Sequence, residues 1–169
     1  DNDTVLGGTG DDVLIGGTGN DLVNGDAGND SLLGGDGADT LSAGNGDDYA
    51  AGGDGNDTLF GGSGNDTLLG ETGDDLLFSG SGDDTLTGGA GNDSLDGATG
   101  TDQAILSGNA ADYVLTESGG NYTIVGADGT DIFSNIESLV FADRTMDVAS
   151  VTDVTAAGSD DVLQGGVSA

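Results

Sequence analysis

The chain has 169 residues, with 32 acidic side chains against a single basic one, Arg144, and it contains no histidine and no cysteine. A formal net charge of −31 excludes nucleic acid as a partner. The missing residue types exclude disulfides and zinc or copper sites built from imidazole or thiolate ligands. No apolar run is long enough to span a bilayer, so we expect no membrane insertion.

Residues 1–105 repeat a nine-residue unit about twelve times without an insertion. One unit is Gly7-Gly-Thr-Gly-Asp-Asp-Val-Leu-Ile15, and the next begins at Gly16. The sixth place of every unit is aspartate: Asp3, Asp12, Asp21, Asp30, Asp39, Asp48, Asp57, Asp66, Asp75, Asp84, Asp93 and Asp102. So strict a register indicates one small structural unit stacked on copies of itself.

The other places of the unit have their own residue preferences. Glycine occupies the fourth place of every full unit and most of the first two, and the fifth is usually asparagine or aspartate. These residues favour turns with positive φ. The eighth place is aliphatic between variable neighbours, as in a short strand that turns one side chain inward. We therefore expect a six-residue turn and a three-residue strand in each unit. The inward residues would be Val5, Leu14, Val23, Leu32, Leu41, Ala50, Leu59, Leu68, Leu77, Leu86, Leu95 and Ala104.

Aspartate at the sixth place indicates a metal ligand. A turn former on a solvated surface is the alternative, and it explains the fifth place. It does not explain the sixth, where asparagine would serve a turn equally well but never occurs. Carboxylate and backbone carbonyl oxygens are the usual ligands of Ca²⁺, whereas Mg²⁺ prefers a rigid octahedron that keeps its water. The pattern therefore predicts calcium binding.

The unit resembles the calcium-binding nonapeptide repeat of the repeats-in-toxin (RTX) family. The resemblance implies an all-β fold, a right-handed parallel β-roll over residues 1–105 with two units per 18-residue coil and two short parallel sheets. It also implies a row of Ca²⁺ ions along each of the two edges, with about nine or ten ions in total. Each ion would lie between turn n and turn n+2. Both sixth-place carboxylates and loop carbonyls would hold each ion. The expected carbonyl ligands are Gly8, Gly10, Gly17, Gly19, Gly28, Gly35, Gly37, Gly44, Gly46, Gly53, Gly55, Gly62, Gly64, Gly73, Gly80, Gly82, Gly89, Gly91 and Gly100.

The seventh and ninth places face outward in such a roll. Alternate units stack on one sheet, so two outer faces carry apolar residues. One face would hold Ile15, Leu33, Ala51, Leu69 and Ile105, and the other Leu6, Phe60, Leu76 and Phe78. Ordinary surface residues, or cover by the C-terminal segment, are one interpretation. A lateral contact with another roll is the other.

Residues 106–143 leave the nine-residue register and hold most of the aromatic side chains. Segments 113–117 and 121–125 are expected to form a hairpin, 128–131 a turn, and 132–133 and 136–141 further strands. The segment 129–143 resembles the stretch that commonly follows RTX arrays, which implies a β-rich cap. Residues 144–157 are expected to be a linker. Residues 158–169 would begin a second array, with Asp161 at a sixth place and Leu163 at an eighth, as in a module excised from a longer protein.

Function follows from the resemblance and from the uniform use of aspartate. No acid is set apart with a histidine, cysteine or lysine partner, so we expect no enzyme activity. The resemblance implies a calcium-dependent structural module of a larger, type I-secreted bacterial protein, extracellular or at the cell surface. An adhesin or surface-layer segment is one version. A passenger module that supports export and folding of an attached enzyme or toxin is the other.

Overall fold

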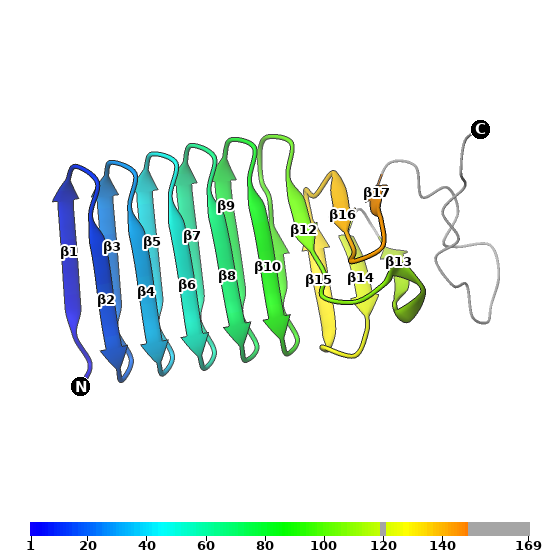
Figure 1. Ribbon diagram of the computed structural model, residues 1–169, viewed down its shortest axis with the longest axis horizontal. Helices are drawn as coiled ribbons and strands as arrows, with labels where there is room; N and C mark the ends of the chain where they lie inside the picture. The colour runs from blue at the N-terminus through cyan, green and yellow to red at the C-terminus, as the bar shows by residue number, and fades with distance from the viewer. Residues whose placement is uncertain (119–120, 149–169) are drawn as a thin grey trace.

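The computed structural model describes residues 1–118 and 121–148, which form a long parallel β-solenoid with a short cap at one end (Figure 1). Two sheets run along its length. Sheet A contains, in spatial order, β1 (Thr4–Thr9), β3 (Leu22–Ala27), β5 (Thr40–Asn45), β7 (Thr58–Ser63), β9 (Leu76–Ser81), β11 (Ser94–Asp96), β15 (Thr130–Ser134), β14 (Asn121–Val125) and β13 (Val114–Ser118). Sheet B contains β2 (Val13–Thr18), β4 (Ser31–Asp36), β6 (Tyr49–Asp54), β8 (Thr67–Thr72), β10 (Thr85–Ala90), β12 (Gln103–Ile105), β16 (Ser138–Val140) and β17 (Thr145–Asp147).

The repeat strands pair in parallel with a shift of one coil. Leu14 lies opposite Leu32 in sheet B, and Val23 lies opposite Leu41 in sheet A, each pair separated by two units of sequence. Successive units therefore alternate between the two sheets. The predicted parallel roll with two units per coil is confirmed.

The strands are longer than the sequence analysis expected. From β1 to β10 each strand has six residues, places seven to nine and one to three, and only places four to six form the turn. Pairing skips the first place and resumes at the second and third, as between Gly17 and Gly35. The second-place residue has positive φ even where it is not glycine, +70° at Asp26 and +78° at Glu71. A residue in this conformation bends a strand without ending its ladder, so the expected six-residue turn is wrong.

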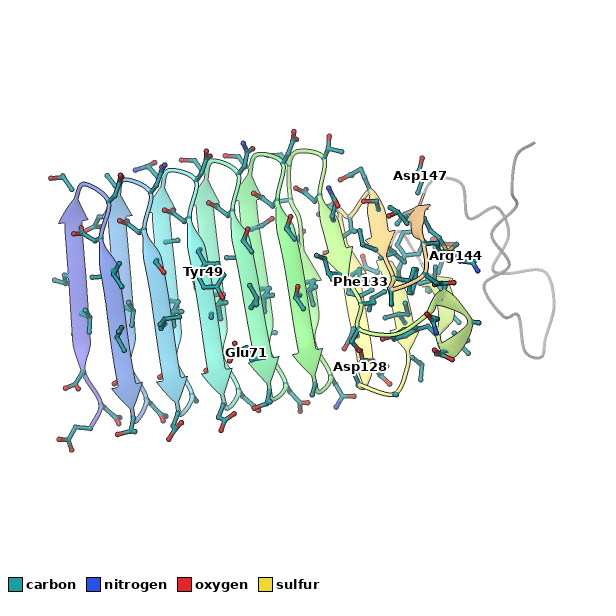
Figure 2. The ribbon with its side chains drawn as sticks, in the orientation of Figure 1. Tyr49, Glu71, Asp128, Phe133, Arg144 and Asp147 are labelled. Atoms are coloured by element: carbon teal, nitrogen blue, oxygen red, sulfur yellow. The ribbon has the colours of Figure 1, made fainter. Side chains whose placement is uncertain are left out.

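The core is a single ladder of eighth-place side chains between the sheets. All of them except Val5 at the open end are buried, and from Val23 to Leu86 none of them has exposed surface. The ladder continues into the cap, because Phe133 pairs with Leu95 and Leu139 pairs with Ala104. Figure 2 shows Phe133 at the point where the roll meets the cap. The inward orientation predicted for the eighth place is confirmed.

The cap ends each parallel sheet with antiparallel strands. In sheet A, β15 is followed by the hairpin of β14 and β13, and in sheet B, β16 is followed by β17. A 3₁₀ turn, η1 (Ala110–Asp112), precedes the hairpin, and Tyr113 and Phe141 pack together with ring centroids 5.5 Å apart.

The structure tests only part of what the sequence predicts for residues 144–169. The segment 144–157 was expected to be a linker, yet 145–147 belong to sheet B, because their backbone pairs with β16. The expected second array, 158–169, lies outside the described residues. No helix among the described residues is long and apolar enough to cross a bilayer.

Candidate calcium sites

The sixth-place aspartate ends each turn, and its carboxylate reaches back to the preceding coil. The backbone N–H of Asp21 donates to Oδ1 of Asp39 at 2.7 Å, and the N–H of Asp39 donates to Oδ1 of Asp57 at 2.7 Å. The same bond recurs along both edges of the roll. We call the row of Asp3, Asp21, Asp39, Asp57, Asp75 and Asp93, each before a sheet A strand, the sheet A file. The sheet B file is Asp12, Asp30, Asp48, Asp66, Asp84 and Asp102.

The second oxygen of these carboxylates, Oδ2, is buried and has no hydrogen-bond partner in eleven of the twelve predicted aspartates. They are Asp12, Asp21, Asp30, Asp39, Asp48, Asp57, Asp66, Asp75, Asp84, Asp93 and Asp102. From Asp21 onward each residue is at most 3% exposed. An ionised carboxylate buried without a partner destabilises a fold strongly. These oxygens therefore need a partner from outside the chain.

The chain itself has no cation to give them. Arg144 is the only lysine or arginine in the sequence, and its guanidinium pairs with Asp143 at 3.0 Å in the cap (Figure 2). The turns of the roll lie away from this pair. Neutralisation of the two files therefore depends on dissolved cations.

A second oxygen faces Oδ2 at several of these aspartates. A Cβ added to Gly34, at the first place of its unit, would overlap Oδ2 of Asp39 and the carbonyl oxygen of Gly52 in the next coil. The same two kinds of oxygen meet at Gly7, Gly16, Gly25, Gly61 and Gly70. Carboxylate and carbonyl oxygens that converge with no hydrogen between them are arranged as ligands of a cation are.

Carbonyl oxygens of the second and fourth places face the gap between consecutive turns of a file. Gly35 (φ +115°) and Gly37 (φ +134°) have positive φ, and the carbonyl oxygens of Gly17 and Gly19 fill the space where their Cβ atoms would lie. Every glycine predicted as a carbonyl ligand has positive φ. These residues therefore share one backbone conformation, which brings their carbonyl groups close to the next turn.

Burial changes the acidity of the files in the absence of metal. Desolvation raises the pKa of Asp66 to about 7 and the pKa values of Asp57, Asp75 and Asp102 to about 6, from 3.8. The hydrogen bond from the preceding coil lowers these pKa values, and carboxylates of neighbouring coils raise them. Desolvation also raises the pKa values of Asp39, Asp48 and Asp93. A divalent cation beside Oδ2 would favour the ionised form.

The donor set fits calcium. All the oxygens that converge are carboxylate or carbonyl oxygens, which a hard cation with six to eight ligands accepts. No three carboxylates in residues 1–118 and 121–148 form a cluster that could hold a metal by themselves. An ion in a file would therefore be coordinated by the sixth-place aspartates together with backbone carbonyl oxygens. Calcium would supply the positive charge and the links between coils that the chain lacks.

Two carboxylates that the sequence analysis did not assign continue the files into the cap. Asp131 accepts the backbone N–H of Asp93 at 3.0 Å, and Glu137 accepts that of Asp102 at 2.7 Å. A signal for Asp131 is present, because 126–134 reads Gly-Ala-Asp-Gly-Thr-Asp-Ile-Phe-Ser and keeps places one, four, six and eight. The twenty residues 106–125 separate this unit from the array and hide its register. Glu137 has no such signal.

A parallel solenoid with two files of buried carboxylates and facing carbonyls belongs to the class of metal-stabilised repeat proteins. The model of the RTX calcium-binding nonapeptide repeat (4 copies) matches residues 1–32, 33–68 and 69–104, and the chain belongs to this family of calcium-binding repeats.

This chain is also similar, at low sequence identity, to a solved structure. The solution structure of the AlgE6R3 subunit from the Azotobacter vinelandii mannuronan C5-epimerase is 21% identical to this chain. The match covers 95% of this chain and 90% of that one, with a TM-score of 0.37. No curated protein matches this chain.

Proposed function

We propose that this chain is a non-enzymatic, calcium-dependent folding module of a larger secreted bacterial protein, in which calcium converts an expanded acidic chain into a stiff β-roll. The eleven buried Oδ2 atoms without a partner are the observation that carries this proposal. Without metal, a net charge of −31 opposes compaction. Burial of a single ladder of aliphatic side chains stabilises the fold too little to offset the lost conformational entropy of the chain. With metal, the binding free energy becomes folding free energy.

The proposal includes export of the parent protein through a type I system. A chain that stays unfolded at low calcium can pass through an export channel, and it folds where calcium is plentiful. The family and the acidic composition support this location outside the cell or on its surface.

Circular dichroism during a calcium titration at neutral pH tests the folding switch. We expect a coil-like spectrum in chelator and a cooperative gain of β signal with calcium, because each site joins two neighbouring coils. Magnesium at equal concentration is the control and should give little signal. A full β spectrum in chelator, or equal folding in magnesium, would contradict the proposal.

Lateral contact in an adhesin or surface layer is the more specific role that we favour for the module. Phe60 and Phe78 stack on the outer face of sheet A with ring centroids 5.4 Å apart, and they remain 41% and 38% exposed. On sheet B, Val13 and Ile15 are 73% and 59% exposed. Large exposed apolar side chains in one place favour association with another surface. The alternative is a passenger module, for which these residues are ordinary surface.

Sedimentation of dilute protein in calcium distinguishes the two roles. Lateral contact predicts self-association that weakens in the double variant F60S/F78S, whose exchanges lie outside the core and should leave the β spectrum intact. Thr40→Ser, on the same face but without an aromatic ring, is the matched control. A wild-type protein that stays monomeric in calcium favours the passenger role.

A further inference from the structure

The nine-residue unit places glycine directly after its third place and, in most units, directly after its ninth. An asparagine at either place therefore precedes a glycine, which happens in this sequence only at Asn24–Gly25 and Asn45–Gly46. The backbone nitrogen that follows an asparagine can attack its side-chain amide, and glycine obstructs this attack least because it has no Cβ. These two pairs are therefore the places where the chain is most able to modify itself.

The folded roll restrains both partners of the second pair. Asn45 is the last residue of β5, and its backbone pairs with Ala27 and Ser63 in the neighbouring coils. Its Oδ1 accepts the Ser63 hydroxyl at 2.9 Å, and its Nδ2 donates to the carbonyl oxygen of Asp26 at 3.5 Å. The N–H of Gly46 donates to the carbonyl oxygen of Ser63 at 2.8 Å. Attack by the Gly46 nitrogen requires this bond to open and the asparagine amide to turn, so the fold opposes the reaction.

The first pair is restrained within a strand. Asn24 belongs to β3, and its backbone pairs with Ser42 of β5. Its Nδ2 donates to Oδ1 of Asp26 at 2.8 Å, and Gly25 is buried. The roll therefore holds the side-chain amide of each asparagine and encloses the backbone beside it, whereas an unfolded chain does neither.

The reaction needs no reagent other than water. The nitrogen of Gly46 attacks Cγ of Asn45 and closes a succinimide ring, the bond from Cγ to Nδ2 breaks, and the amide proton leaves with Nδ2 as ammonia. Water then opens the ring. Hydrolysis of the new bond gives aspartate, and hydrolysis of the original peptide bond gives isoaspartate, whose main chain runs through the side chain and is longer by one carbon. Neither product reverts to asparagine, because ammonia has been lost.

An isoaspartate at position 45 would change the turn that orders a calcium ligand. Asp48 ends this turn, accepts the N–H of Asp30 at 2.7 Å, and donates its own N–H to Oδ1 of Asp66 at 2.9 Å. A longer main chain before Asp48 would displace its carboxylate from the sheet B file. Each coil stacks on the next, so a defect in a central coil weakens the folding of its neighbours as well.

We propose that Asn24–Gly25 and Asn45–Gly46 are self-modification sites that calcium-induced folding protects, so that the chain loses its ability to fold the longer it stays without calcium. This proposal rests on the proposed calcium-dependent folding. It adds an irreversible limit to that reversible switch. A short period without calcium leaves the chain intact, and a long one leaves isoaspartate in the central coils.

Peptide mapping by tandem mass spectrometry measures the reaction in the full chain, incubated at neutral pH in chelator or in calcium. In chelator we expect Asn24 and Asn45 to convert to aspartate and isoaspartate faster than Asn65, which precedes an aspartate. Calcium should slow the conversion at both glycine pairs several-fold, because the roll holds the reacting groups apart.

Circular dichroism after calcium addition gives a second readout on samples aged in chelator. The wild type should recover less β signal the longer it is aged. The double variant N24S/N45S is the matched control, because serine occupies the same places of other units at Ser42 and Ser63. It should fold in calcium when fresh and lose its recoverable signal more slowly than the wild type.

The outcomes separate this proposal from the one on which it rests. A fresh wild type whose spectrum does not respond to calcium refutes the folding module and the protection together. A calcium-dependent spectrum with equal conversion in chelator and calcium, or with conversion no faster than at Asn65, refutes the self-modification sites alone. Equal loss of signal in the wild type and N24S/N45S also overturns them. Should the double variant not fold, peptide mapping of the wild type decides by the same criteria.

Discussion

The backbone N–H of Asp57 donates to Oδ1 of Asp75, 2.8 Å away and one coil further along the chain. This bond fixes one oxygen of the carboxylate and leaves Oδ2 buried without a partner. It also means that each coil positions the ligand of the next. Binding and stacking are therefore coupled along the solenoid, which gives several measurable consequences.

Removing one buried carboxylate in the middle of a file should weaken calcium-dependent folding. Asp57→Asn keeps an acceptor for the N–H of Asp39 but loses the charge beside the ion, so the calcium midpoint of the circular dichroism transition should rise several-fold. Asp54→Asn is the matched control, because Asp54 is exposed at a third place and its carboxylate accepts a hydrogen bond from the Thr72 hydroxyl. Equal shifts for the two variants would show that net charge alone matters.

The number of bound ions should match the gaps between turns. Six turns in each file leave five gaps, so the array offers about ten sites. Anomalous scattering from crystals grown in calcium should show two rows of peaks along the turns. Fewer than about five ions, or ions away from the two files, would be incompatible with this arrangement.

A charge placed in the aliphatic ladder should prevent folding of the central coils. Leu59 has no exposed surface, and Leu59→Asp would bury an unpaired carboxylate between the sheets. The milder Leu59→Ala should cost about 2–5 kcal/mol, as cavity-forming changes do. Thr58→Asp, one residue earlier on the outer face, should have a small effect on the calcium-induced β signal. If Thr58→Asp disrupts folding as severely as Leu59→Asp, the inward assignment is wrong.

The response to pH should change sign with calcium. Without metal, burial raises the pKa of Asp66 to about 7 against an unfolded value of 3.8, so the folded chain binds more protons between these values. Stability of the metal-free roll is then greatest below pH 3.8 and is lost as pH rises through about 7. Lowering the pH in chelator should therefore increase β signal.

With calcium bound, the ligand carboxylates are held ionised, and their folded pKa values should fall below the unfolded value. Their stabilisation is present above the unfolded pKa and is lost as pH drops through the depressed folded one. Circular dichroism melts in chelator and in calcium between pH 4 and 8 compare the two cases. Parallel pH profiles in both conditions would argue against metal at the buried carboxylates.

The array was predictable from sequence because its signals are local and repeated. Asp66 and Leu68 each occupy a place whose residue type recurs every nine residues, and the structure puts the former in a turn and the latter in the core. The exclusion of asparagine from the sixth place predicted a calcium ligand before any geometry was known. Strand length was not predictable in this way, because it depends on how Asp26 and Glu71 adopt positive φ within a ladder.

The sequence by itself determined the repeat, the inward ladder, the calcium chemistry and the family, since each depends on residue type at a fixed spacing. Only the tertiary structure decided how the roll ends. Twenty inserted residues break the spacing, and it is stacking against Asp93 that places Asp131 in the file. Glu137 accepts the N–H of Asp102 from a connection of three residues between β15 and β16, whereas β11 and β12 are joined by six. Contacts between segments far apart in the chain leave no regular spacing in the sequence, so only the stacked structure reveals them.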